Sequence, residues 1–336
     1  MFVGISVYIC IPMRRIILLL FLILFALPGQ LFARPVAPVW RDVAYKTVDS
    51  LSMKLDIYLP PDTTSSRPYP VIVYIHGGSW VTGSKEAFVI PYMEAVLRAV
   101  LDEGYAVVSI EYLLADTLSG EASFPRAIAD CKDAIRWVRA HAREYRLDPH
   151  RIGLWGSSAG AHLSLLAAYT PDTLFRGDAL LSRYSAQVDY VIDDYGPTHL
   201  NKLFRTHLDP LSLGLVKMAA PALYREREMM LSVFLGDERR RRRVNSTCRY
   251  YSPMTYVGEG AVPTLLLHGD KDKVVPLKQS RKLARALAKA DTPHRLVVYP
   301  GAGHSFRTFT TEEIDDIRRN VLDFLHACAN KNTEKP

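Results

Sequence analysis

The chain has 336 residues, of which 49% are hydrophobic and 23% are charged. These proportions are typical of a globular protein with a large core and exclude a disordered or fibrous one. The formal net charge of +7 is modest for this length, and no basic stripe interleaved with aromatic residues is present, so we expect no nucleic-acid partner.

The N-terminus has the pattern of a secretory signal. Arg14 and Arg15 precede twelve consecutive apolar residues at 16–27, and Ala33 follows as a small residue suited to cleavage. The apolar run is shorter than the about 20 residues that a transmembrane helix needs. We therefore expect a signal peptide at 1–33, a secreted or periplasmic protein, and no stable membrane partner after its removal. An uncleaved anchor is the alternative.

Strand and helix signals alternate along residues 34–336. The first two strands alternate in polarity and predict an antiparallel pair, and 71–75 is a β-branched run typical of a strand buried on both faces. Ser123 is expected to cap one helix, and Thr310 with Glu313 forms a capping box for the last. The expected strands are 42–48, 53–59, 71–75, 106–110, 151–155, 188–192, 262–267 and 295–299, and the expected helices are 87–101, 123–138, 161–168, 276–290 and one from Thr311. This order predicts a single α/β domain whose mostly parallel sheet has helices on both faces.

A segment at about 199–256 interrupts the alternation. It is far longer than a simple connection, which typically runs about 2–6 residues. It contains a helix-like stretch at Pro221–Leu235 and the basic run Arg239–Arg243. An insertion at this point would lie over the C-terminal edge of the sheet, where open α/β sheets bind ligands. The arginine run is expected to be either a solvated helix face or a contact for an acidic substrate.

Gly156–Gly160 matches the G-x-S-x-G nucleophile elbow, with Ser158 at its centre. An apolar strand precedes it and a run of helix formers follows, which is the setting that the motif requires. A serine hydroxyl is a poor nucleophile at neutral pH, so a strained turn must hold it near a base. We predict that Ser158 is the nucleophile.

The motif His76–Trp80 directly follows the buried strand at 71–75. Its two glycines allow the backbone to turn N–H groups toward a developing oxyanion, so Gly77, Gly78 and the N–H of Ala159 are the oxyanion-hole candidates. An ordinary glycine turn is the alternative. Trp80 is either a wall for an acyl or aryl group or a packing residue.

A base and an acid follow at later strand ends. His304 lies in a glycine-rich loop after the last strand, from which it can reach Ser158 as general base. Asp272 lies in the loop after the preceding strand and is the expected carboxylate partner of His304. The nearby Asp270 is expected to shape the turn after Gly269. No metal and no organic cofactor is required by this chemistry.

The order Ser158, Asp272, His304, with the oxyanion loop upstream, is that of α/β-hydrolases. The chain resembles serine esterases of this superfamily with an HGG oxyanion motif. More narrowly, it is similar to secreted feruloyl/acetyl-xylan esterase-like carbohydrate esterases. The residues that carry the narrower resemblance are His76–Trp80, Gly156–Gly160, Tyr195–Pro197, Ser252–Pro253 and Gly269–Asp272.

This resemblance implies an α/β-hydrolase fold with a cap-like insertion, and hydrolysis of carboxylic esters through an acyl-enzyme. The implied partner is a small-molecule or polysaccharide ester, with acetyl or feruloyl groups on plant-type polysaccharides as the substrate. The chain departs from the group at Thr198–His199, where an acidic residue is frequent. A short-chain carboxylesterase or lipase, a serine peptidase and a noncatalytic hydrolase-like binding module remain alternatives.

Overall fold

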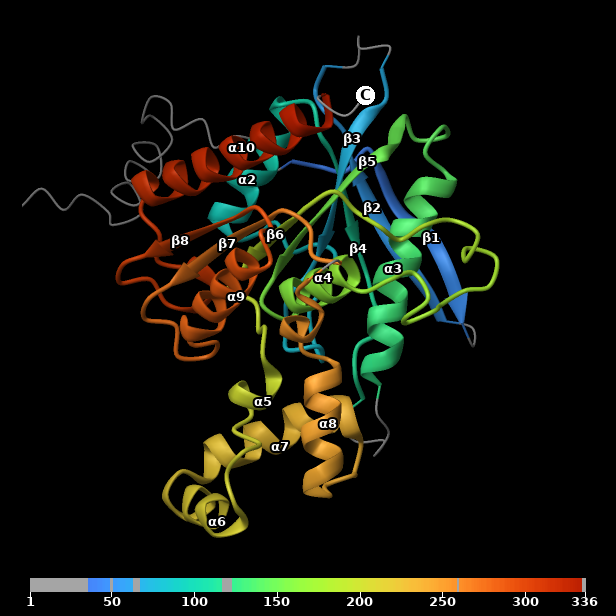
Figure 1. The fold of residues 1–336 in the computed structure, drawn as a ribbon. Coiled ribbons are helices and arrows are strands. Elements are labelled where there is room, and N and C mark those ends of the chain that lie inside the picture. Colours follow the sequence, from blue (N-terminus) through green and yellow to red (C-terminus); the bar gives the residue numbers. More distant parts are fainter. Residues whose placement is uncertain (1–35, 49–50, 63–66, 117–122, 259, 334–336) are drawn as a thin grey trace, which may run out of the picture. The chain divides into compact units, whose positions relative to one another are not determined.

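One eight-stranded sheet organises the described part of the chain (Figure 1). The structure is a computed structural model that describes residues 36–48, 51–62, 67–116, 123–258 and 260–333. All of these residues except Val36 lie in one compact unit, Ala37–Pro336. The predicted signal peptide at 1–33 lies outside the described residues. Within those ranges, no helix is long and apolar enough to cross a membrane.

The strand order confirms the predicted α/β-hydrolase fold. The first strand pairs antiparallel with the second, the second pairs antiparallel with β4, and all later pairs are parallel. In spatial order the strands are β1 (Trp40–Val48), β2 (Leu51–Tyr58), β4 (Ala106–Ile110), β3 (Tyr69–Ile75), β5 (Leu147–Ser157), β6 (Val191–Asp194), β7 (Thr264–Gly269) and β8 (His294–Tyr299).

Helices cover both faces of this sheet. Helix α2 (Pro91–Asp102) packs with α10 (Thr311–Thr333) on one face, whereas α3 (Phe124–Ala140), α4 (Ala159–Tyr169) and α9 (Lys278–Lys289) cover the other. The predicted capping box of α10 is present, because Thr310 N donates to Glu313 Oε2 at 2.7 Å and Glu313 N donates to Thr310 Oγ1 at 3.3 Å.

Three local predictions are corrected. Helix α2 begins at Pro91 and not near residue 87, because the residue before a proline avoids the helical region and Ile90 is extended. The strand expected at 188–192 is Val191–Asp194, since it continues into two buried aspartates that an apolar pattern does not reveal. Ser123 precedes α3 with helical dihedrals, and its side chain makes no capping hydrogen bond.

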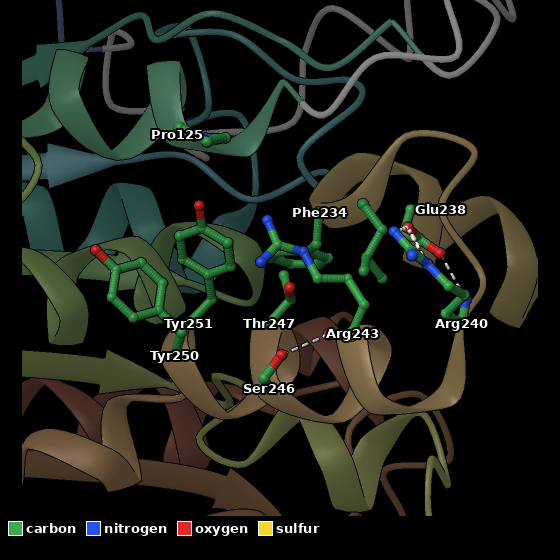
Figure 2. Close-up of a pocket in the computed structure, with 10 residues that line it drawn as sticks. Pro125, Phe234, Glu238, Arg240, Arg243, Ser246, Thr247, Tyr250 and Tyr251 are labelled. Carbon is green, nitrogen blue, oxygen red and sulfur yellow. Dashed lines mark hydrogen bonds and ion pairs between the residues drawn. The ribbon is translucent and has the colours of Figure 1, made fainter.

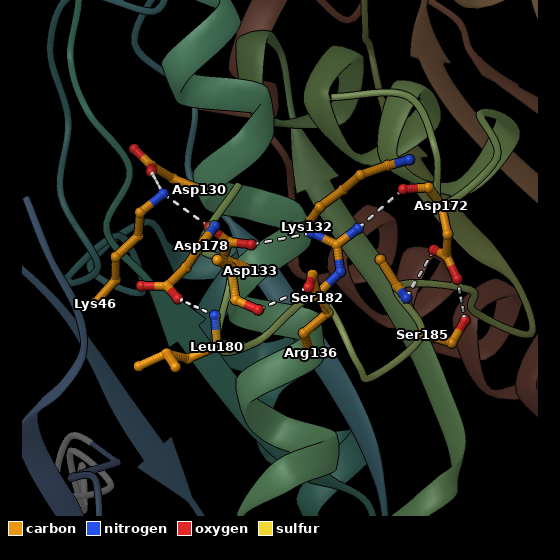
Figure 3. A network of polar contacts seen from close by, with 12 residues as sticks. Lys46, Asp130, Lys132, Asp133, Arg136, Asp172, Asp178, Leu180, Ser182 and Ser185 are labelled. Carbon is orange, nitrogen blue, oxygen red and sulfur yellow. Dashed lines mark hydrogen bonds and ion pairs between the residues drawn. The ribbon is translucent and has the colours of Figure 1, made fainter. Parts of the chain in front are cut away.

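A buried ionic network fastens β1 to α3 (Figure 3). Lys46 Nζ lies 2.7 Å from a carboxylate oxygen of both Asp130 and Asp133, and Asp133 also pairs with Arg136 at 3.0 Å. On the same helix, Lys132 Nζ donates to the carbonyl oxygens of residues 170, 171 and 174, and burial lowers its pKa to about 8. Loss of either partner of such a pair leaves a buried charge uncompensated, so this network fixes the position of α3.

The segment 199–256 folds as helices that stand apart from the sheet (Figure 1). We call it the cap. An aromatic cluster attaches it to the sheet domain: Phe234 packs on Phe124 at 4.5 Å and on Trp80 at 5.0 Å between ring centroids. His162 Nε2 and Tyr251 O, 2.7 Å apart, add a hydrogen bond to this junction. The elements of the cap are α5 (Leu200–Leu203), α6 (Pro210–Ala219), α7 (Pro221–Leu235, as predicted), α8 (Arg241–Tyr250) and the 3₁₀ turn η1 (Pro253–Tyr256).

Candidate active site

Ser158 occupies the sharp turn between β5 and α4. Its φ of 52° and ψ of −116° are an uncommon conformation for a residue with a side chain. The two flanking glycines permit the close contacts of this turn: a Cβ on Gly160 would lie 2.0 Å from Ile75 O, and one on Gly156 would lie 2.5 Å from the Gly160 backbone. The strain therefore holds the Ser158 hydroxyl outside the regular elements.

Gly160→Ala is expected to destabilise the fold by about 3 kcal/mol or more, because the new Cβ meets rigid backbone that cannot shift without opening the β3–β5 pair. Gly214→Ala is the matched control, since a Cβ at that position in α6 meets nothing within 4 Å and alanine is the better helix former. Thermal unfolding of both variants measures the difference. Equal melting temperatures would show that the elbow tolerates the extra atom.

The structure brings Ser158, His304 and Asp272 into one hydrogen-bonded line. His304 Nε2 lies 2.9 Å from Ser158 Oγ, and His304 Nδ1 lies 2.7 Å from Asp272 Oδ2. The other carboxylate oxygen, Asp272 Oδ1, accepts hydrogen bonds from the N–H groups of Val274 and Val275, each at 2.8 Å. This geometry suits a nucleophile, a base and an orienting carboxylate.

Asp272 is kept ionised by its surroundings. Burial alone would raise its pKa, but hydrogen bonds from His268 and His304, the charge of His304 and the Val275 N–H together hold the pKa well below its usual range. The ring of His268, which the sequence analysis did not single out, lies with Nε2 3.3 Å from Asp272 Oδ2 and 2.7 Å from Val275 O. It follows that His268 supports the acid loop.

Asp270 lies directly after Gly269, but its side-chain hydrogen bond joins a neighbouring loop and not its own turn. Its Oδ1 accepts a hydrogen bond from Gly301 N at 2.7 Å, and Lys271 N donates to Ala302 O at 2.9 Å. These bonds join the loop after β7 to the loop that carries His304. The carboxylate at 270 therefore positions backbone, whereas the one at 272 faces the imidazole.

The three predicted oxyanion-hole residues converge on the elbow. A Cβ on Gly77 would lie 3.4 Å from Ser158 Cβ, and Gly78 has a φ of 117°. Ala159 directly follows Ser158 at the start of α4. Among the described residues, no hydrogen bond occupies the N–H groups of Gly77, Gly78 or Ala159, whereas the N–H of Ser158 donates to Asp194 O at 2.8 Å.

The glycine loop is braced by His76, another residue that sequence reasoning left without a role. His76 is buried, its Nδ1 lies 2.7 Å from Gly77 O, and its ring stacks on Tyr112 at 4.4 Å. Because a carbonyl only accepts hydrogen bonds, Nδ1 carries the proton. His76 therefore holds the carbonyl of Gly77 and with it the direction of the loop.

Two cavities meet at Ser158. The first, which we call the narrow cavity, has a volume of about 210 Å³ and runs toward the cap, and Trp80 forms part of its wall. The second, the open groove, has a volume of about 760 Å³ and is lined by both oxyanion-loop glycines, Tyr195 and His304. The apolar walls of the narrow cavity are Trp80, Pro197, Leu203, Phe204, Leu223, Met230, Val274 and Val275.

Trp80 is a packing residue that also lines a cavity. It is only 3% exposed and packs on Phe124, His162 and Phe234, as a core residue does. The same side chain also lines the narrow cavity beside Ser158. A core tryptophan thus forms part of the wall of the narrow cavity.

A buried polar network lies behind the elbow and carried no sequence signal. Asp194 accepts hydrogen bonds from Trp155 Nε1 at 2.9 Å and from the Tyr92 hydroxyl at 3.2 Å, and the Tyr92 and Tyr195 hydroxyls lie 2.6 Å apart. Burial raises the pKa of Asp194 to about 7 and that of Asp193 to about 6. The Tyr195 ring then contacts His304 at 4.8 Å between centroids, so the network supports both the elbow and the base.

The arginine run does not face Ser158. Arg239 pairs with Glu228 at 2.9 Å and Arg240 with Glu238 at 2.6 Å. Arg240 and Arg243 instead line a separate groove of about 780 Å³ between α7, α8 and the start of α3, together with Tyr250 and Tyr251 (Figure 2). The run is thus an exposed part of the cap, and none of its members lines the narrow cavity or the open groove.

The fold and the geometry of the site together place the chain in the α/β-hydrolase class. Comparison with known proteins agrees with this class and narrows it. The BD-FAE family model matches residues 55–287, more than half of the chain, and the chain belongs to this family. A second model, for TAP-like proteins, matches residues 246–332.

Similar proteins are named as esterases. Esterase LipQ of Mycobacterium tuberculosis is 31% identical over 274 residues, covering 81% of this chain and 58% of LipQ. The chain thus spans a little over half the length of the curated relatives it matches. Esterase 2 of Thermogutta terrifontis with bound propionate aligns with a TM-score of 0.63 and 26% identity over 87% of this chain and 94% of that structure. A truncated carbohydrate esterase from gut microbiota shares the fold, with a TM-score of 0.67 and 24% identity over 88% of this chain and 99% of that one.

Proposed function

We propose that the protein hydrolyses carboxylic esters with Ser158 as nucleophile, His304 as general base and Asp272 as the orienting carboxylate. Ser158 Oγ attacks the ester carbonyl while His304 Nε2 takes its proton, and the alkoxide leaves with that proton. Water then attacks the acyl-enzyme with the same base and releases the acid. The N–H groups of Gly77, Gly78 and Ala159 stabilise the oxyanion in both steps. The single observation that carries this proposal is the unbroken line Ser158–His304–Asp272.

The position of His304 supports a separate role for each of the two cavities. The leaving alkoxide must receive its proton from His304, and His304 lines the open groove but not the narrow cavity. The alcohol part of the ester therefore belongs in the open groove, and the acyl group belongs in the narrow cavity. A volume of about 210 Å³ is roughly seven times the share of one water molecule in the liquid, so it accepts an acetyl group and larger acyl groups.

We propose acetyl or feruloyl groups on plant-type polysaccharides as the natural substrate. The open groove is wide and carries polar side chains such as Ser84, Glu86 and Arg307, which suits a bulky hydroxylic alcohol. The narrow cavity is lined mostly by apolar side chains, and these apolar walls suit an acyl or aryl group. Its charged lining residues are Glu226, Arg227 and Lys273. Membership of the BD-FAE family and the carbohydrate esterase of similar fold support this choice. The N-terminal pattern supports a secreted or periplasmic location, where such polymers are met.

A short-chain carboxylesterase is the second candidate, favoured by the propionate-bound esterase of Thermogutta terrifontis. A substrate panel separates the two: acetylated xylan, methyl ferulate, p-nitrophenyl esters of increasing length and a chromogenic peptide. Release of acetate or ferulate, with low peptide hydrolysis, supports the carbohydrate assignment. Turnover of p-nitrophenyl esters alone supports the second candidate, and no turnover at all would favour a noncatalytic module.

Met230→Trp is expected to lower kcat/KM for p-nitrophenyl hexanoate by about tenfold or more, relative to p-nitrophenyl acetate, because the larger ring fills the narrow cavity. Met229→Trp is the matched control, since the neighbouring side chain on α7 is 42% exposed and is not part of that wall. A loss of the same size for both esters would mean that the acyl group lies elsewhere.

A further inference from the structure

Helix α6 of the cap is apolar almost throughout, yet none of its residues is buried. Leu211, Leu215 and Met218 are 77%, 59% and 82% exposed, and Lys217 is the only charged residue of the helix. A helix that is hydrophobic around its whole circumference is normally buried in a core. Singly scattered exposed leucines need no explanation, but three on one short helix indicate a surface that something covers.

The three exposed residues share one face that points away from the rest of the cap. Their spacing of four and then three positions places them one above the other on a helix. The opposite side is occupied, because Leu213 and Pro210 line a small cavity with Tyr224 of α7. The helix itself is well formed, with the Asp209 side chain capping Ser212 N at 3.0 Å. The exposed face is therefore a stable feature of the folded cap.

The surroundings of this face are basic. Residues 199–256 contain eleven Lys and Arg against five Asp and Glu, a surplus of six out of the net +7 of the whole chain. Arg241 donates to His207 O just before α6, and with Arg239 it lies against Pro210 and Leu213. Because two identical basic faces repel each other, this charge disfavours a second copy of the chain as the partner. It favours a partner that is both apolar and anionic.

We propose that α6 docks the protein on an anionic lipid surface. Leu211, Leu215 and Met218 enter the boundary between headgroups and acyl chains, and the cap arginines meet the headgroup phosphates. Leu223 of the neighbouring helix α7 is another exposed apolar residue, 46% exposed, and it also lines the narrow cavity. Docking would therefore bring the cap side of the narrow cavity near the lipid surface. The inference rests on the cap alone and does not depend on which ester is hydrolysed.

Cosedimentation with vesicles tests this proposal. The chain should begin at Ala37, because residues Ala37–Pro336 form one compact unit with the whole sheet, and the apolar run at 16–27 is then absent. We expect binding to vesicles of phosphatidylcholine with phosphatidylglycerol, and at least tenfold weaker binding to phosphatidylcholine alone. The double variant Leu215→Glu/Met218→Glu should lose binding, and Arg241→Glu/Arg242→Glu should lose the preference for the anionic lipid.

Leu180→Glu is the matched control, because Leu180 is 77% exposed but lies outside the cap. It should bind as the unchanged chain does. All variants should hydrolyse a soluble p-nitrophenyl ester equally, which shows that they are folded and keeps a failure of the docking proposal separate from a failure of the esterase proposal. The docking proposal is overturned if the unchanged chain does not sediment with anionic vesicles or if Leu180→Glu loses as much binding. It is also overturned if light scattering shows a dimer that Met218→Glu dissociates.

Discussion

Replacement of Ser158 by alanine is expected to lower kcat for p-nitrophenyl acetate by roughly 10⁵-fold or more. The hydroxyl at this position is the one bonded to His304 Nε2, at 2.9 Å, so no other group in the elbow can be deprotonated by that imidazole. Weak residual turnover from the oxyanion N–H groups is expected to remain. The melting temperature should change little, because the substitution removes only the partly exposed hydroxyl oxygen of Ser158. Steady-state kinetics and thermal unfolding of the same preparation provide both measurements.

The neighbouring Ser157 offers a matched control. Its hydroxyl is buried and bonded to the Tyr74 hydroxyl at 2.9 Å, away from His304. Ser157→Ala should therefore retain most of the activity and still react with a fluorophosphonate probe, whereas Ser158→Ala should not be labelled. Near-normal turnover in Ser158→Ala, or an equal loss in both variants, would show that the nucleophile has been assigned wrongly.

The sequence predicted the three residues of the hydrogen-bonded line because each of them follows a recognisable strand. The elbow serine, His304 and Asp272 all lie at carboxyl ends of parallel strands, and these ends meet at one edge of the sheet. The order of these three residues along the chain then restricted the role that each of them could have. The continuous β-branched run of β3, and the alternation of strand and helix signals around it, predicted the elements that bring these ends together.

The supporting polar residues could not be predicted in the same way. Asp193 and Asp194 are fully buried, and a buried polar side chain breaks the apolar pattern by which a strand is recognised. Their partners, Tyr92 and Trp155, come from different elements, so only the folded chain shows that they are satisfied. The supporting roles of His76 and His268 could not be predicted either, because no sequence pattern indicates which groups their rings contact in the folded chain.

The walls of the narrow cavity depend on how the cap attaches. Leu203 and Met230 lie on two different cap helices, and they line the narrow cavity beside Ser158 because the cap attaches through Phe234, which packs on Trp80 and Phe124. The helix propensities of the cap residues do not determine this contact between the cap and the sheet domain. This is why the sequence predicted the helix Pro221–Leu235 but not which of its residues line the narrow cavity.

Asp272→Asn is expected to lower kcat by about 10⁴-fold while keeping the fold. The remaining oxygen can still accept from the N–H groups of Val274 and Val275, but the amide NH₂ then faces His304 Nδ1. Because that nitrogen must accept a hydrogen bond from the amide, the proton moves to Nε2, and the imidazole can no longer take the proton of Ser158. Asp270→Asn is the control: its oxygen still accepts from Gly301 N, so the loss should be small.

The pH dependence adds a second measurement to this pair. The pKa of Asp272 is held well below its usual range, so folding stability from this group is complete above the ordinary aspartate pKa of about 3.9 and is lost as the pH falls through the lower, folded value. Above about pH 4 the carboxylate of Asp272 stays ionised, so its contribution to stability should be lost only in more acid solution, which thermal unfolding across this pH range measures. Comparable losses of kcat in Asp272→Asn and Asp270→Asn would contradict the assignment of Asp272 as the partner of His304.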